Sequence, residues 1–171
     1  MKSGFIIIFC LVVCNFSIKA QTKGSLSVNV TTKSTGLPGK NYAPKNSMVI
    51  WVEDESHNFV KTLLVNAQAR RMALKNWEAS TKSTGRTFNA ADAITGATNN
   101  NHGTRSCDWD GTDFSGKIMP DGNYILHMEL TDLDAAGHLS EFNFSKGPDP
   151  VKLSPGDQPS FTSVSINWIP D

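Results

Sequence analysis

The sequence predicts an all-β protein, an antiparallel β-sandwich with one added α-helix. About seven short segments alternate apolar and polar residues or are apolar throughout, and Gly, Pro, Asn and Asp separate them. Only one segment carries apolar residues at the three-and-four spacing of a helix. The chain is 39% hydrophobic and 19% charged, which suits one ordinary core and makes intrinsic disorder a poor description.

Residues 1–20 have the layout of a secretory signal peptide. Lys2 supplies the positive start, the apolar run covers residues 5–13, and Ala20 ends the segment with a small side chain. This run is shorter than the roughly 20 residues that a membrane-spanning helix needs. We therefore expect cleavage after Ala20, a periplasmic location, and a single domain at residues 21–171 that is not embedded in a membrane.

The charge of the mature chain bears on its binding partners, and its cysteine content decides whether it can form a disulfide. The full sequence has 16 basic and 16 acidic residues, and removal of Lys2 and Lys19 leaves 14 − 16 = −2. A neutral or acidic chain lacks the basic surplus that binds phosphate backbones, so no nucleic-acid partner is expected. Cys107 is the only cysteine left after cleavage, so an internal disulfide is excluded.

The strands are placed by periodicity and by the turns between them. Residues 48–53 are apolar on both faces, which predicts a central strand, whereas residues 25–31, 123–130 and 162–169 each have one apolar face. In residues 123–130 the apolar face leaves His127 on the opposite side, where we expect it to meet water. The expected strands are residues 25–31, 48–53, 59–65, 104–109, 123–130, 139–144 and 162–169.

One helix is expected at residues 66–80, capped by Asn66, with Ala69, Met72, Ala73 and Trp77 packed against a sheet. The polar, Gly- and Asn-rich residues 81–103 that follow predict a long loop. A loop of this length in a compact domain more often has a function than not.

The segment WDGTDFSGKIMPDGNY, residues 109–124, predicts a turn region that leads into the next strand. The Asp110 and Asp113 carboxylates can accept hydrogen bonds from nearby backbone amides, which makes a calcium loop unnecessary to explain them. The segment resembles the hairpin of the immunoglobulin-like module in flagellar hook-capping proteins. That resemblance implies an immunoglobulin-like sandwich and no particular activity.

The heptad DAITGAT, residues 92–98, offers a hydroxyl on a slim backbone that a modifying enzyme could grip. It resembles the acceptor motif of proteins modified by the exported flavin transferase, with Asp92, Thr95, Gly96, Ala97 and Thr98 at the motif positions. The resemblance implies that FMN is joined through its phosphate to Thr98, which we expect to face outward.

The chain from residue 48 to residue 144 is similar to a family of predicted periplasmic domains of unknown function. Their genes often neighbour those of flavin transferases and PepSY-type membrane reductases, which the resemblance implies as partners. Thr95 stands where Ser is common, and Asn99-Asn100-Asn101-His102 replaces the shorter link expected after the acceptor.

These observations favour an exported electron carrier with covalent FMN and no catalytic residues of its own. The alternative is a cofactor-free binding or structural module in which residues 81–103 form a plain surface loop, and a hydrolase fits less well because no catalytic arrangement can be placed. Trp77, Phe88 and His102 are candidates to lie against a flavin ring, but a packing or surface role is the first interpretation of each. The four histidines have no metal-ligand spacing, so no metal site is expected.

Overall fold

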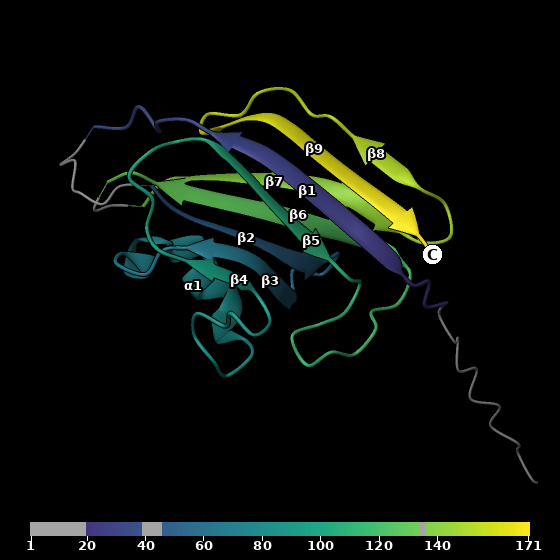
Figure 1. Ribbon diagram of the computed structural model, residues 1–171. Helices are drawn as coiled ribbons and strands as arrows, with labels where there is room; N and C mark the ends of the chain where they lie inside the picture. Colours follow the sequence, from purple (N-terminus) through teal and green to yellow (C-terminus); the bar gives the residue numbers. More distant parts are fainter. Residues whose placement is uncertain (1–19, 39–45, 134–135) are drawn as a thin grey trace, which may run out of the picture.

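Two β-sheets packed face to face form the body of the protein (Figure 1), as seen in a computed structural model that describes residues 20–38, 46–133 and 136–171. The predicted signal peptide, apart from Ala20, lies outside the described residues. The four-stranded sheet has the order β5 (Thr104–Trp109), β1 (Gly24–Thr32), β9 (Phe161–Pro170), β8 (Val151–Leu153). The five-stranded sheet has the order β4 (Ile94–Gly96), β3 (Phe59–Asn66), β2 (Ser47–Asp54), β6 (Gly122–Thr131), β7 (His138–Lys146).

The predicted all-β sandwich is confirmed, and each of the seven expected strands is present. All pairings between named strands are antiparallel except β3 with β4, which is parallel. Strands β4 and β8 were missed because each has only three residues and lies within a polar segment. The expected loop at residues 81–103 is therefore interrupted by β4. The immunoglobulin-like assignment stays a prediction.

The space between the two sheets is filled by the alternating side chains that the sequence pattern assigned to the core. Tyr124, Leu126, Met128 and Leu130 of β6 are all buried there, as predicted. Burying one such side chain contributes roughly 1.5–3 kcal/mol, so this layer supplies most of the driving force for folding. Cys107 also points inward, and burial, helped by the neighbouring Asp108 charge, raises the pKa of its thiol to about 12.

A second, smaller core covers the outer face of the five-stranded sheet. It joins Val49 and Trp51 of β2 to Leu74 and Trp77, which lie at the start of helix α1 (Lys75–Lys82). Strand β2 is consequently buried on both faces, which explains its continuous apolar sequence.

The helix differs from the prediction. Asn66 ends β3 and caps nothing, a short 3₁₀ turn covers Arg71–Ala73, and α1 follows at Lys75–Lys82. Ala69 and Met72, expected to face the sheet, are exposed, whereas the expected burial of Ala73 and Trp77 is confirmed.

A buried carboxylate from the sheet fixes the start of α1. Glu129 of β6 is fully buried, and it accepts hydrogen bonds from the backbone amides of Asn76 and Trp77 and from the Asn76 side chain, at 2.9–3.2 Å. These amides belong to the first turn of the helix, which has no hydrogen-bond acceptors within the helix itself. Burial raises the pKa of Glu129, while these same hydrogen bonds oppose the rise. Glu129 therefore acts as a cap supplied 53 residues away in sequence.

The connection between β5 and β6 crosses from one sheet to the other, so these two strands do not form a hairpin, but the local hydrogen bonds predicted for its aspartates are present. Asp110 accepts hydrogen bonds from the backbone amide and hydroxyl of Thr112, and Asp113 accepts from the amides of Ser115 and Lys117. Both carboxylates are thus used locally, as proposed from the sequence.

Replacing Glu129 with alanine leaves two buried backbone amides and the Asn76 side chain without their acceptor. We expect Glu129→Ala to lower the free energy of unfolding by about 1.5–3 kcal/mol, the range for hydrogen bonds to a charged group. The exposed Glu55→Ala is the matched control, expected to stay within about 0.5 kcal/mol. Urea unfolding measures both, and equal losses in the two variants would show that Glu129 does not fix the helix.

Candidate functional site

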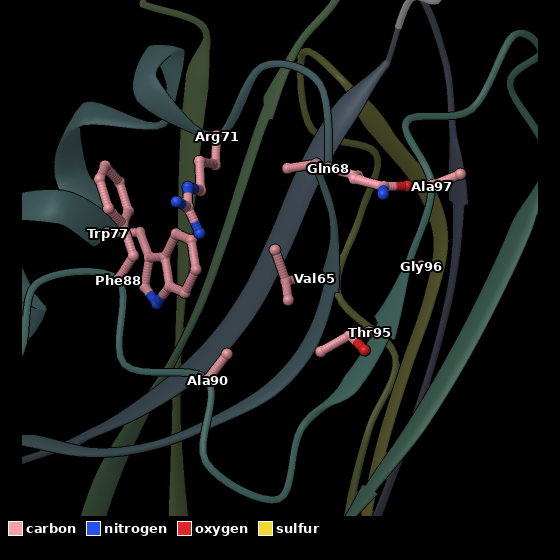
Figure 2. Close-up of a pocket in the computed structure, with 10 residues that line it drawn as sticks. Val65, Gln68, Arg71, Trp77, Phe88, Ala90, Thr95, Gly96 and Ala97 are labelled. Atoms are coloured by element: carbon pink, nitrogen blue, oxygen red, sulfur yellow. The ribbon is translucent and has the colours of Figure 1, made fainter.

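A groove of about 370 Å³ lies on the outer face of the five-stranded sheet, between the α1 region and β4 (Figure 2). Its volume falls in the range of small-molecule sites. Val65 of β3 forms its floor. Figure 2 shows Trp77, Phe88 and Arg71 on one side of Val65 and the β4 segment on the other.

Aromatic rings form the first wall. The ring centroids of Trp77 and Phe88 lie 5.3 Å apart at an angle of 54°. The Trp77 indole is held by a 2.9 Å hydrogen bond from Nε1 to the hydroxyl of Thr62, which in turn donates to the Asn89 carbonyl. The Arg71 guanidinium lies 5.6 Å from the centre of the Phe88 ring. The wall thus presents apolar rings and one positive charge.

The predicted acceptor motif forms the second wall. Ile94, Thr95 and Gly96 pair with Leu64, Val65 and Asn66 of β3, so this stretch is an edge strand and not part of the long loop predicted for residues 81–103. A Cβ at Gly96 would lie 2.5 Å from Nδ2 of Asn66, so glycine permits the close approach of that side chain. Thr95, Gly96 and Ala97 line the groove, as shown in Figure 2.

Thr98 was expected to face outward, and this expectation was wrong. Thr98 is only 6% exposed, and its Oγ1 accepts a 3.1 Å hydrogen bond from the backbone amide of Ala69, in the turn after β3. Asp92 lies in an exposed turn before β4, with a positive φ of 57°, and does not line the groove. The motif is therefore split, with its three middle positions at the groove, Thr98 beneath the adjoining turn and Asp92 at the surface.

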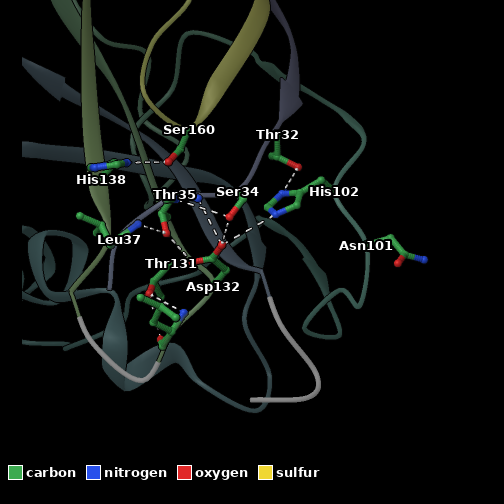
Figure 3. A network of polar contacts seen from close by, with 12 residues as sticks. Thr32, Ser34, Thr35, Leu37, Asn101, His102, Thr131, Asp132, His138 and Ser160 are labelled. Atoms are coloured by element: carbon green, nitrogen blue, oxygen red, sulfur yellow. Dashed lines mark hydrogen bonds and ion pairs between the residues drawn. The ribbon is translucent and has the colours of Figure 1, made fainter. Parts of the chain in front are cut away.

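The segment after Thr98 is tied to the rest of the protein through His102 (Figure 3). Its Nδ1 lies 3.3 Å from the Thr32 hydroxyl and its Nε2 lies 4.0 Å from Asp132. Asp132 also accepts hydrogen bonds from the hydroxyl of Ser34 and from the amide and hydroxyl of Thr35. His102 thus takes part in this network and does not line the groove, whereas Trp77 and Phe88 do.

The sequence also placed His127 in water, and this was wrong. His127 is 3% exposed because its face of β6 is covered by the α1 region and by Trp51, whose ring stacks on the imidazole at 4.8 Å. Its Nε2 lies 3.1 Å from Oε2 of Glu53. Burial raises the pKa of Glu53, but the close contact with the His127 imidazole and the hydrogen bonds from Ser80 and Trp51 outweigh this and hold the pKa at about 2.

The fold and the groove together define a β-sandwich domain with a small-molecule-sized groove on its covered sheet. The chain belongs to the family described as a predicted periplasmic protein (DUF2271), whose family model matches residues 26–154. This description agrees with the periplasmic location expected from the sequence. No curated protein and no solved structure matches the chain. Among the described residues, no helix has the length and apolarity required to cross a membrane.

Substitution of Thr98 tests what its hydroxyl contributes to the stability of the fold. We expect Thr98→Val, which keeps the shape and removes the acceptor for the Ala69 amide, to lower the free energy of unfolding by about 1 kcal/mol. Thr98→Ser retains the oxygen and should recover most of that hydrogen bond. Chemical denaturation of both variants measures the difference, and a Val variant as stable as the parent would mean that the bond contributes nothing.

We expect the contribution of Asp132 to the free energy of unfolding to depend on pH. Burial raises its pKa, but hydrogen bonds from Thr35 and Ser34 outweigh this and leave the pKa below the ordinary value. A lowered pKa in the folded state stabilises the protein above the unfolded value of about 3.9, and this stabilisation is lost as the pH falls through the folded value. The stability difference between the parent and Asp132→Asn should therefore be larger at pH 7 than at pH 3. A difference independent of pH would contradict the assignment.

Proposed function

We propose that this protein is an exported electron-transfer protein that carries FMN joined covalently to Thr98 by a flavin transferase. The observation that carries the proposal is the groove, because the middle of the acceptor motif, Thr95 to Ala97, lies opposite Trp77 and Phe88. A PepSY-type membrane reductase is the proposed electron-transfer partner.

The residues of the groove fit a planar aromatic cofactor with a negatively charged group. Trp77 and Phe88 offer ring faces for stacking, and Val65 offers an apolar floor. The Arg71 guanidinium supplies a positive charge that favours an anionic ligand and the more negative, reduced form of a redox group. When bound, a flavin supplies hydride and single-electron transfer, and the protein contributes position and surroundings.

Because the Thr98 hydroxyl is buried, attachment of FMN requires this part of the chain to open first. In the modification, Oγ1 of Thr98 forms a bond to the FMN phosphorus of FAD, the pyrophosphate bond breaks, AMP leaves, and the hydroxyl proton passes to a base of the transferase. The hydrogen bond from the Ala69 amide to Oγ1 has to open before the transferase reaches this oxygen. One hydrogen bond contributes about 1 kcal/mol net to stability. Breaking it in a local opening of this turn therefore does not require the whole domain to unfold.

The second candidate is a cofactor-free binding module, and the burial of Thr98 favours it. In this case the same groove takes a small aromatic ligand without a covalent bond, and Thr98 serves only to hold the turn after β3. The two candidates differ in whether flavin stays attached to the denatured chain.

Attachment is tested by producing the full chain with a flavin transferase in an exporting host. We expect in-gel flavin fluorescence from the denatured protein and a mass gain of one FMN less one water. Thr98→Ala should abolish both signals, since no oxygen is left to bond, and Thr98→Ser should retain them. Thr104→Ala, a change of an exposed threonine on β5, is the control that should load fully.

Two results would contradict the proposal: an unmodified parent chain, or equal loading of Thr98→Ala and the parent. The position of the ring is tested separately with Arg71→Gln. Loss of this positive charge should lower the reduction potential of attached flavin without reducing the loaded fraction. An unchanged potential would place the ring outside the groove while leaving the attachment itself intact.

A further inference from the structure

Three side chains from separate parts of the chain meet on the other side of α1. Glu53 lies on β2, His57 in the turn between β2 and β3, and His127 on β6, and their nitrogen and carboxylate atoms all lie within 4.8 Å of one another. They line a hollow of about 320 Å³ together with α1 residues. Two imidazoles and a carboxylate are a frequent ligand set for zinc and related ions.

The distances within the cluster agree with coordination of one ion. Oε2 of Glu53 lies 3.1 Å from Nε2 of His127 and 3.3 Å from Nδ1 of His57. Ligands about 2.0–2.1 Å from a tetrahedral zinc ion are separated by roughly 3.3–3.4 Å. Both distances from Glu53 are therefore close to those around an ion, and the two histidine nitrogens, which lie within 4.8 Å of each other, would complete the site by a rotation of the exposed His57 ring.

His127 provides an independent observation. Its side chain is only 3% exposed, yet within the described residues neither ring nitrogen has a hydrogen bond of ordinary geometry. Buried polar groups are nearly always paired, because leaving them unpaired costs free energy. A cation bound to Nε2 would satisfy this nitrogen.

The surroundings hold the ligands in place as a metal centre requires. Oε1 of Glu53 accepts hydrogen bonds from Trp51 Nε1 and from the Ser80 hydroxyl, which leaves Oε2 for the ion. The Trp51 ring stacks on His127, and Oε1 of Glu141 lies 3.4 Å from Nδ1 of His127. A carboxylate beside the second nitrogen is the usual partner of a metal-bound histidine, because it fixes the tautomer.

We propose that Glu53, His57 and His127 bind one divalent transition-metal ion, with solvent in the fourth position. The open position follows from His57, whose side chain is 65% exposed, and from the hollow on this side of the cluster. A site with three protein ligands and one exchangeable position belongs to the binding or catalytic kind, since structural zinc sites have four protein ligands. The proposal does not depend on the flavin.

Zinc binding to the EDTA-treated, re-dialysed full chain tests the site. Isothermal titration with Zn²⁺ should give a stoichiometry of one, and Zn²⁺ should raise the melting temperature of the parent by mass action. His57→Asn removes a ligand and suits the backbone, because residue 57 has a φ of +60° and asparagine tolerates this region. We expect this variant to bind zinc at least about tenfold more weakly.

The controls separate this site from incidental binding by histidine. His138→Asn changes a histidine of β7 that contacts Ser160 and is not part of the cluster, and this variant should bind zinc as the parent does. Glu53→Gln should weaken binding as His57→Asn does, and cobalt absorption in the parent should show a four-coordinate spectrum that both variants lose. No saturable binding by the parent, or equal affinity of the parent and His57→Asn, would overturn the proposal and leave an ordinary ion pair of Glu53 with His127.

Discussion

The contact between Glu129 and the first turn of α1 is the constraint on which the rest of the outer face depends. This carboxylate is fully buried on β6, an inner strand of the five-stranded sheet, and three hydrogen bonds from the start of α1 compensate for its burial. The position of α1 decides where Trp77 lies over the sheet and where Ser80 meets Glu53. One helix therefore positions both the groove and the histidine–glutamate cluster.

Apart from the three-residue β4 and β8, the strands could be predicted from the sequence because each is defined by its own pattern. Alternation in β1, β6 and β9 gives the inner face directly, and the continuous apolar run of β2 indicates its central place. The helix could not be placed in the same way. Its cap comes from Glu129, 53 residues further along the chain, whereas the local candidate, Asn66, pairs with Met48 and Gly96 as part of a strand.

The site was predicted in part. Three residues of the motif, Thr95, Gly96 and Ala97, line the groove. The position of Thr98 could not be predicted, because its hydroxyl accepts a hydrogen bond from the amide of Ala69, which no local sequence pattern reveals. The cluster of Glu53, His57 and His127 gave no sequence signal for a related reason. Glu53 and His127 are diagonal neighbours across the β2–β6 pair, where Trp51 lies opposite His127, and only strand register brings them together.

Cys107 gives the protein a property suited to an oxidising compartment. With a thiol pKa of about 12 and a position between the two sheets, almost none of it is thiolate at neutral pH, and oxidants or disulfide-forming enzymes do not reach it in the native fold. Separation of the sheets exposes a thiol of ordinary reactivity. Covalent dimers or adducts with small thiols would therefore mark molecules that had failed to fold, and a maleimide dye would count the same population in a purified sample.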